Sequence, residues 1–336
     1  HDALPIFDSW KDMKKTLLFI TGLSFIIELM GAFFIFLTIR FDYSLPKALF
    51  YALFHAVAAF CNAGFCPFKN GMISYATNYN MLIITSLLMI SGGIGFITWK
   101  DLFSWWKTKS KRYQFSLQTK IVLSYYFFFV IAGTFLFWVL EHHNTFELLP
   151  APLQWCNAFF TSVSSRSGGY MSVHTDAMQN ASLFTLMISC FIGSAPGSTG
   201  SGIKLTTAAI FLGTINAAIA GRATVNVGKR SIAKDQIYRA LALVTLTIVW
   251  MTLTTFCLLI TENSLPFLEV LFESVSAFTT LGISIGITPY LSFAGKMLIA
   301  LSMFIGRIGS LTLLIALRTK REPGEYSYPE ERVMIT

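Results

Sequence analysis

The sequence predicts an all-α membrane protein in which tandem repeats surround a central pore. Hydrophobic residues make up 54% of the chain and charged residues only 12%, a balance that soluble domains do not show. Several apolar runs reach or approach the roughly 20 residues needed to cross the hydrocarbon core. A third observation is a repeated order of long apolar run, short apolar run after a proline, glycine loop and long apolar run. Its pivotal glycines, Gly64, Gly169 and Gly282, stand 105 and 113 residues apart, which suits a unit that crosses a membrane twice.

The long apolar runs predict six membrane spans. A helix rises about 1.5 Å per residue, so runs of this length cover the hydrocarbon core. The chain is therefore expected to be a multi-pass protein. The runs are 16–38, 81–98, 120–140, 182–220, 237–260 and 291–317.

Three shorter runs between these spans predict half-helices that enter the membrane and turn back. They cover 46–60, 152–163 and 266–278, and each begins beside a proline, which suits the first turn of a helix. Twelve to fifteen residues cover only about 18 to 22 Å. Non-helical backbone at membrane depth survives only where it is buried in protein or lines water, so the loops that follow should face an aqueous path.

The glycine loops after the half-helices are the candidate cation filter. Backbone carbonyls can replace the water oxygens of a small cation without burying a fixed negative charge. Glycine suits such a site because it adopts conformations that other residues avoid and lets chains approach closely. The negative ends of the half-helix dipoles would also favour a cation there. The alternative, that the glycines are packing hinges, is weakened because three loops follow three half-helices in the same order. The candidate filter residues are Asn62, Ala63, Gly64, Phe65, Ser167, Gly168, Gly169, Tyr170, Thr280, Leu281, Gly282 and Ile283.

A second glycine-rich element interrupts the apolar run at 182–220 and is the candidate gate. A helix cannot pass smoothly through 193–204, so a non-helical segment should lie inside the membrane, just below the filter. The spacing of Gly197 and Gly202 superficially matches a phosphate-binding loop, but Ile203 stands where that motif needs lysine. A harmless helix break is the remaining alternative. The candidate gate residues are Gly197, Ser198, Thr199, Gly200, Ser201, Gly202 and Lys204.

Arg307 is the clearest candidate for a functional charge inside the membrane. It lies within the last predicted span, where a charged side chain is costly and therefore marks function. A positive charge under a cation filter could lower ion occupancy or pair with the gate, and Lys204 could act similarly.

The distribution of Lys and Arg predicts the orientation of the chain. Basic residues collect at 11–15, 100–120, 222–239 and 318–321, whereas the opposite loops are richer in Glu and His. The positive-inside rule therefore predicts that the basic loops and the C-terminus are cytoplasmic and that the half-helices enter from outside. Binding to nucleic acid is the poorer explanation of the net charge of +8, because the basic residues are split among four segments beside the spans.

These residues resemble the Trk/Ktr/HKT superfamily of cation transporters, in particular the bacterial potassium-uptake subunits of the TrkH and KtrB kind. The resemblance implies four repeats of outer helix, pore helix, filter loop and inner helix around one pore, an intramembrane gate loop in the third repeat, and the Arg307 position beneath the filter. It further implies the inner membrane, a homodimer and a nucleotide-binding regulatory subunit of the TrkA/KtrA kind on a separate chain. The segments that carry it are 59–65, 164–170, 194–204, 276–284, 303–307 and 328–332.

Counting repeats reveals a departure from this family pattern. Three repeats are present of the expected four, and matching the gate loop makes the absent one the first. The expected parts are 1–110 as repeat 2, 111–232 as repeat 3 with the gate, 233–322 as repeat 4 and 323–336 as a cytoplasmic tail. The chain is therefore expected to be a fragment or the product of a truncated gene.

The favoured function is potassium uptake through a filter of backbone carbonyls. K+, or alternatively Na+, would be the transported ion, with no resident cofactor and no nucleic acid partner. The alternatives are a sodium-coupled or sodium-selective transporter, or a non-conducting subunit that acts as a scaffold. A broken-helix transporter for anions would place half-helix N-termini at the substrate, whereas here the C-termini face it. No catalytic triad, metal cluster or nucleotide motif supports an enzyme.

Overall fold

The computed structural model describes residues 10–108, 113–222, 224–228 and 230–309. The basic residues Lys109, Lys111, Arg112, Lys229 and Arg318 therefore lie outside the described residues, as does the expected tail at 323–336. The described part is helical apart from its loops and one short hairpin. The predicted all-α membrane fold is confirmed.

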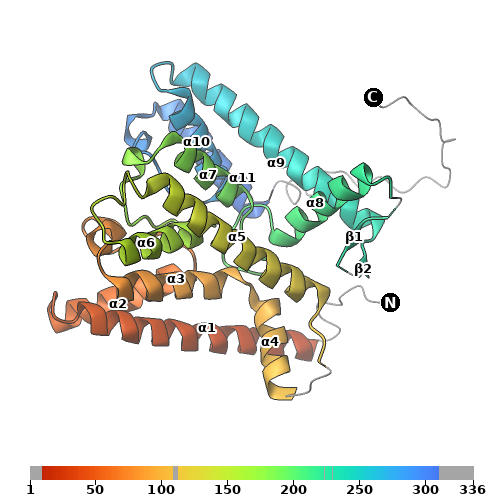
Figure 1. Cartoon of the computed structure of the whole chain (residues 1–336), viewed down its shortest axis with the longest axis horizontal. Coiled ribbons are helices and arrows are strands. Elements are labelled where there is room, and N and C mark those ends of the chain that lie inside the picture. Colours follow the sequence, from red (N-terminus) through yellow and green to blue (C-terminus); the bar gives the residue numbers. More distant parts are fainter. Residues whose placement is uncertain (1–9, 109–112, 223, 229, 310–336) are drawn as a thin grey trace.

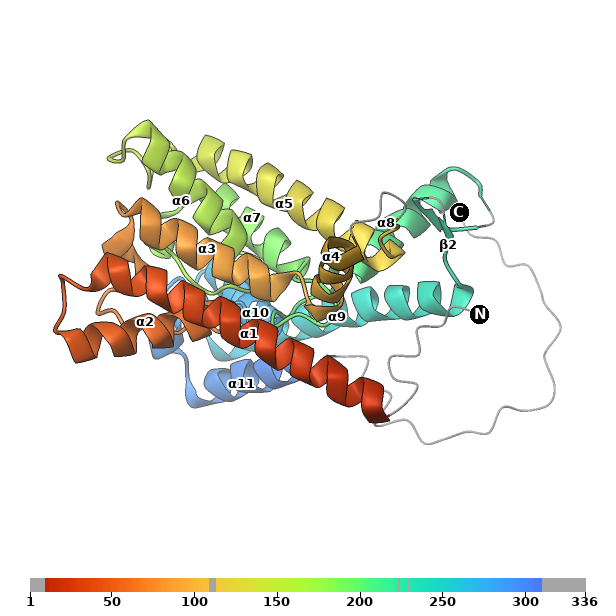
Figure 2. The ribbon, with the colours of Figure 1, turned by 90° about the horizontal axis from the view of Figure 1, so that it is seen from below.

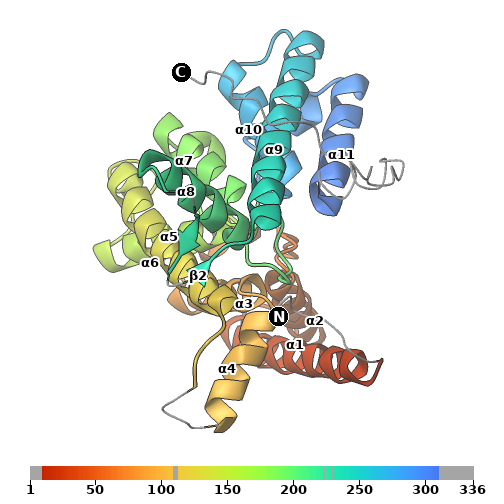
Figure 3. The same cartoon turned by 90° about the vertical axis from the view of Figure 1, so that its right-hand side faces the viewer.

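The helices form three groups that lie around a common central region (Figures 1 and 3). Each group begins with a long helix, continues with a shorter one after a proline, and returns through a third helix. The first group is α1 Trp10–Ile39, α2 Leu45–Phe60, α3 Tyr79–Gly93 and α4 Phe96–Thr108. The second is α5 Leu117–Glu141, α6 Ala151–Ser164, α7 Asn180–Phe191 and α8 Leu205–Ile219. The third is α9 Lys234–Thr261, α10 Phe267–Thr279 and α11 Phe293–Ile308. Short 3-10 turns lie at Gly71–Tyr75, Thr175–Ala177 and Thr288–Tyr290, and β1 Asn226–Val227 pairs with β2 Arg230–Ser231 between α8 and α9.

The short helices α2, α6 and α10 match the predicted half-helices. Pro46 and Pro152 lie in the first turns of α2 and α6, and Pro266 is the N-cap of α10. The three helices contain 16, 14 and 13 residues, so each is about 20 to 24 Å long, less than the roughly 30 Å hydrocarbon core. Each ends in a glycine loop.

The prediction of six uninterrupted spans is only partly matched. In the described part of the chain, α1, α5 and α9 are long and apolar enough to cross a membrane, and the bent pair α3 and α4 would make a fourth span. The apolar run at 81–98 ends early because the chain turns by 96° between α3 and α4, where Gly95 has φ +80°. The run at 182–220 divides into α7 and α8, with a non-helical segment at 192–204 as expected for the gate.

The three groups are held together by the same kind of contact. The returning helix of one group packs on the short helix of the next, α3 on α6 and α7 on α10. The largest apolar core joins the first two groups and includes Met89 of α3 with Phe160 and Val163 of α6. These contacts bring the loops at the ends of α2, α6 and α10 toward one another.

Candidate functional site

The three glycine loops share an alternating backbone conformation. In each loop a non-glycine residue and the glycine two positions later both have φ in the left-handed region, at 50° and 76° for Asn62 and Gly64. Alternation of the sign of φ turns successive peptide groups, so that neighbouring carbonyls can point toward the same side. Such a row of carbonyls suits a dehydrated cation. The matching pairs are Ser167 with Gly169, at 92° and 77°, and Thr280 with Gly282, at 51° and 81°.

Two of the loops begin with the same helix-ending motif. After α2 the N–H of Asn62 donates to Ala59 and that of Ala63 to Ala58. After α10 the N–H groups of Thr280 and Leu281 donate to Ala277 and Ser276 in the same way. This is the Schellman motif, which normally places glycine at the left-handed position. Here Asn62 and Thr280 occupy it, so the glycines stay two residues further along.

The loops approach one another closely. A Cβ atom placed on Gly169 would lie 2.7 Å from the carbonyl oxygen of Leu281 and 3.0 Å from Cα of Gly64. The first and second loops are also joined where the Tyr170 hydroxyl donates to the Phe65 carbonyl at 3.0 Å. Gly282 differs, because a Cβ there would meet nothing within 4 Å. The structure therefore brings the predicted filter residues together, with the third loop approaching through Leu281.

Serines on two half-helices fix the outgoing ends of their loops. Ser164 Oγ donates to the Tyr170 carbonyl at 2.5 Å, and Ser276 Oγ donates to the Ile283 carbonyl at 2.6 Å. The backbone N–H of Tyr170 in turn donates to Ser164 Oγ at 2.8 Å. Each loop is thus anchored to the helix that precedes it.

The candidate gate segment lies directly against the bend between α3 and α4. Its N–H groups at Ala195 and Thr199 donate to the carbonyls of Gly93 and Gly92 at 3.0 and 3.2 Å. The N–H of Phe96 donates back to Gly197 at 3.0 Å. A Cβ on Gly95 would lie 2.5 Å from the Pro196 carbonyl, so the close approach requires glycine. The first group of helices therefore holds the gate segment through its backbone.

The same segment contacts the first two glycine loops. Asn62 Nδ2 donates to Thr199 Oγ1 at 2.9 Å, and Thr199 Oγ1 donates to the Phe60 carbonyl at 3.1 Å. Ser167 Oγ accepts from the N–H of Ser201 at 3.0 Å. Residues 34 to 139 positions apart in the chain thus meet beside the loops.

Arg307 contacts the gate segment from the third group of helices. Its Nη1 donates to the Thr199 carbonyl at 3.2 Å and to Ser201 Oγ at 3.0 Å. Lys204 Nζ donates within the segment, to the Gly200 carbonyl at 2.6 Å. A cavity of about 370 Å³ lies beside these residues and is also lined by Leu243 of α9 and Phe278 of α10. Both cations therefore hold carbonyls and hydroxyls of the gate segment.

Arg166 is a residue of this site to which the sequence pattern assigned no role. It precedes the second glycine loop and is only 3% exposed. Its guanidinium carbon lies 5.0 Å from the ring centroids of both Tyr126 and Phe129, and Nη2 donates to the Ile192 carbonyl at 3.3 Å. The signal in the sequence was an arginine directly after the short apolar run 152–163 and before the glycine loop. This buried cation fixes the second loop against α5 and the start of the gate segment.

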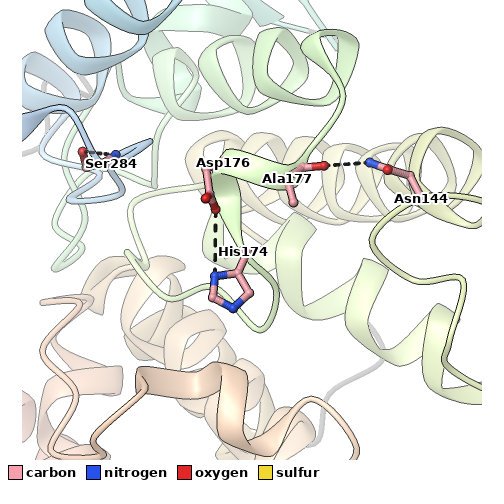
Figure 4. A network of polar contacts seen from close by, with 6 residues as sticks. Asn144, His174, Asp176, Ala177 and Ser284 are labelled. Carbon is pink, nitrogen blue, oxygen red and sulfur yellow. Dashed lines mark hydrogen bonds and ion pairs between the residues drawn. The ribbon is translucent and has the colours of Figure 1, made fainter.

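Polar contacts also lie within the loops that follow the second and third glycine loops, and one joins the former to the loop between α5 and α6 (Figure 4). Asn144 Nδ2 donates to the Ala177 carbonyl at 2.9 Å, and His174 lies 3.9 Å from Asp176. The N–H of Gly286 donates to Ser284 Oγ at 3.0 Å. The loops that carry these groups lie at the end of the molecule opposite the β hairpin (Figure 1).

Fold and site together define a multi-pass helical membrane protein with repeated half-helices and converging glycine loops. A sequence model of the TrkH family, described as "Cation transport protein", matches residues 8–327. The chain belongs to this family, which consists of transporters rather than enzymes.

Curated relatives and a solved structure agree with this assignment. The chain is 32% identical to the potassium/sodium uptake protein NtpJ of Enterococcus hirae, covering 96% of this chain and 72% of that protein. It is 34% identical to the Ktr system potassium uptake protein B of Vibrio alginolyticus, covering 96% and 70%. The crystal structure of the potassium transporter TrkH from Vibrio parahaemolyticus matches with a TM-score of 0.73 at 18% identity, which shows the fold alone. That match covers 92% of this chain, and the chain spans 65% of that structure's length.

Proposed function

We propose that this chain contributes three repeats to a four-repeat pore that takes up potassium. The observation that carries the proposal is the alternating left-handed backbone shared by the three converging loops, because it suits rows of carbonyls facing one cation. Relatives named as potassium uptake proteins support potassium over sodium as the transported ion. An inside-negative potential would drive the ion inward, by about 2.3 kcal/mol per 100 mV for one charge.

In this proposal the segment 193–204 is the gate beneath the filter. It touches two glycine loops and is bonded to both the α3–α4 bend and Arg307. A cation passing the loops would meet this segment next. The segment therefore closes the path while these hydrogen bonds persist, and opening requires them to break.

The proposal of a fourth repeat rests on the exposed face of α2. Among the short helices, α6 exposes one large hydrophobic residue, Trp155, and α10 exposes one, Phe267, because each is covered by a helix of the preceding group. The corresponding helix α2 exposes six. In the same arrangement, α11 would pack on the short helix of a following group, and α11 also exposes large side chains. A further repeat between α2 and α11 would cover both faces and complete the ring of loops. The exposed residues are Leu45, Leu49, Phe50, Leu53, Phe54 and Val57 on α2, and Phe293, Met297, Leu301, Met303, Phe304 and Ile308 on α11.

The division into repeats at 1–110, 111–232 and 233–322, with a tail at 323–336, belongs to this proposal. The proposal also includes a location in the inner membrane and a cytoplasmic position of the basic loops. It further includes a homodimer and a regulatory subunit of the TrkA/KtrA kind. The α1 start, α4, the β hairpin and the α9 start lie at one end of the molecule, which supports a single cytoplasmic side (Figure 1).

Rubidium and sodium uptake by the complete four-repeat transporter in potassium-uptake-deficient cells tests the filter and the gate separately. Gly282→Ser should reduce the preference for rubidium over sodium about tenfold or more, because serine strains a backbone at φ +81°. Gly221→Ser is the matched control, since Gly221 has φ +62°, open space around it and no place in the loops.

Arg307→Met tests the gate in the same cells. Loss of the contacts with Thr199 and Ser201 should raise leak flux several-fold while the ion preference is kept. Lys296→Met, which alters another cation on α11 at the opposite end of the helix, should leave the flux unchanged. Unaltered selectivity in Gly282→Ser would overturn the filter assignment, and unaltered leak in Arg307→Met would overturn the gate.

A further inference from the structure

A second cavity lies away from the glycine loops, between the start of α1 and α4. It has a volume of about 290 Å³, near the lower limit of about 300 Å³ for pockets that hold small molecules. Its walls are apolar and largely aromatic, with Phe19 and Leu23 from α1 facing Trp99, Phe103 and Trp106 from α4. Phe19 and Phe103 are in contact, with ring centroids 5.7 Å apart. The pocket therefore suits a hydrocarbon chain and offers little to a polar ligand.

The direction of α4 places this pocket at a membrane surface. α4 turns by 96° from α3, which runs with the membrane spans, so α4 runs across them (Figure 2). Trp105 and Trp106 on α4 are 48% and 64% exposed. Tryptophans of this kind gather where hydrocarbon meets headgroups, and a helix lying in that plane buries its apolar face in the boundary.

Lysines flank the aromatic face of α4. Lys100 and Lys107 are exposed and seven residues apart, so they lie on one side of the helix, next to Phe103. Lys14 and Lys15 are exposed at the start of α1, the helix that forms the other wall. In the part of the chain that the structure describes, no carboxylate forms an ion pair with Lys100 or Lys107. Four cations beside an apolar pocket complement a ligand with a hydrocarbon chain and a negative headgroup.

We propose that this pocket binds an anionic phospholipid, with an acyl chain between α1 and α4 and the phosphate on the lysines. The occupant comes from the leaflet on the basic side of the molecule, where such lipids attract Lys and Arg. A zwitterionic lipid offers the same acyl chain but no net charge. The preference for a negative headgroup therefore comes from the lysines alone.

Native mass spectrometry of the purified 336-residue chain tests the proposal, with phosphatidylglycerol and phosphatidylcholine titrated separately. The chain should retain one phosphatidylglycerol with clear preference over phosphatidylcholine. The double variant Lys100→Gln and Lys107→Gln should weaken phosphatidylglycerol binding about five- to twentyfold, since each lysine near a charged surface is worth roughly fivefold. Phosphatidylcholine binding should change little.

Two further variants test the headgroup contacts and the acyl-chain pocket separately. Lys120→Gln with Lys234→Gln removes two exposed lysines that do not line the pocket, and should alter binding less than twofold. Leu23→Trp fills the cavity with an apolar group and should reduce retention of both lipids. Equal affinity for the two lipids, or equal effects of the two lysine pairs, would overturn the headgroup assignment. Unchanged retention in Leu23→Trp, or a co-purifying polypeptide in place of lipid, would overturn the acyl site.

Discussion

At the scale of single residues, Gly169 is the glycine that lies against both of the other glycine loops. Its φ of +77° lies where an L-residue is strained by about 1 to 2 kcal/mol. A Cβ would also lie 2.7 Å from the Leu281 carbonyl oxygen. Gly169→Ala should therefore force the second and third loops apart, and we expect rubidium uptake by the complete transporter to be lost.

Backbone strain and collision can be separated with a second glycine. Gly71 has φ +60° but open space around its Cα, so Gly71→Ala introduces the same kind of strain without the contact. It should lower the thermal unfolding temperature of the purified protein slightly and leave uptake intact. Equal uptake by Gly169→Ala and Gly71→Ala would show that the close approach at Gly169 has no role in transport.

The sequence predicted which glycines lie in the converging loops but not the non-glycine residues of positive φ that accompany them. Gly64, Gly169 and Gly282 stood out because glycine tolerates positive φ and close approach. Asn62, Ser167 and Thr280 adopt positive φ as well, which their chemistry alone does not require, because the helix endings and loop contacts impose it. The contact of Asn62 with Thr199 crosses 137 residues and follows from tertiary packing, which no local pattern encodes.

At the scale of elements, Glu262 joins the end of α9 to the start of α11. Its carboxylate accepts from Ser292 Oγ at 2.5 Å and from the Ser292 N–H at 3.1 Å. The Ser292 hydroxyl, as the largest cause, holds the pKa of Glu262 below its ordinary value of 4.5. Because the pKa is lowered in the folded state, this contact stabilises the fold above the ordinary value and is lost as the pH falls through the lowered one.

The contribution of the Glu262–Ser292 contact to stability can be measured from the unfolding temperature as a function of pH. Between pH 7 and pH 3.5, the unfolding temperature of the unaltered protein should fall more than that of Glu262→Gln, which has no carboxylate to protonate. At pH 7 the variant should be the less stable of the two. Glu147→Gln, at an exposed loop position, provides the matched control and should retain the full pH dependence. Identical pH profiles for all three proteins would exclude this role of Glu262.

The helix boundaries could be predicted where prolines or glycine-rich stretches interrupt the sequence. Prolines marked the starts of α2, α6 and α10, and the glycine-rich stretch marked the break between α7 and α8. The bend between α3 and α4 was missed because no charged residue or proline interrupts the run 81–98. Gly92, Gly93 and Gly95 were the available signal, but their effect depends on the gate segment packed against them.

At the scale of the whole molecule, the ring of helix groups is open between α2 and α11. The exposed apolar face of α2 predicts that this chain alone does not form a selective pore. Reconstituted into liposomes by itself, it should show no preference for rubidium over sodium. The same chain supplied with the first repeat of a KtrB relative should gain selective flux. Selective flux by the chain alone would contradict the four-repeat proposal.

The proposed gate segment is attached to two separate helix groups, so it can move only when both sets of contacts break. The α3–α4 bend holds it through three backbone hydrogen bonds, and Arg307 holds it from the third group of helices. If each attachment stabilises the closed position by about 2 kcal/mol, each alone is released about 1 time in 30. Independent release of both then occurs about 1 time in 900. Under the proposed gating, a stimulus that frees only one helix group would leave the path shut, so opening would require both attachments to be released together.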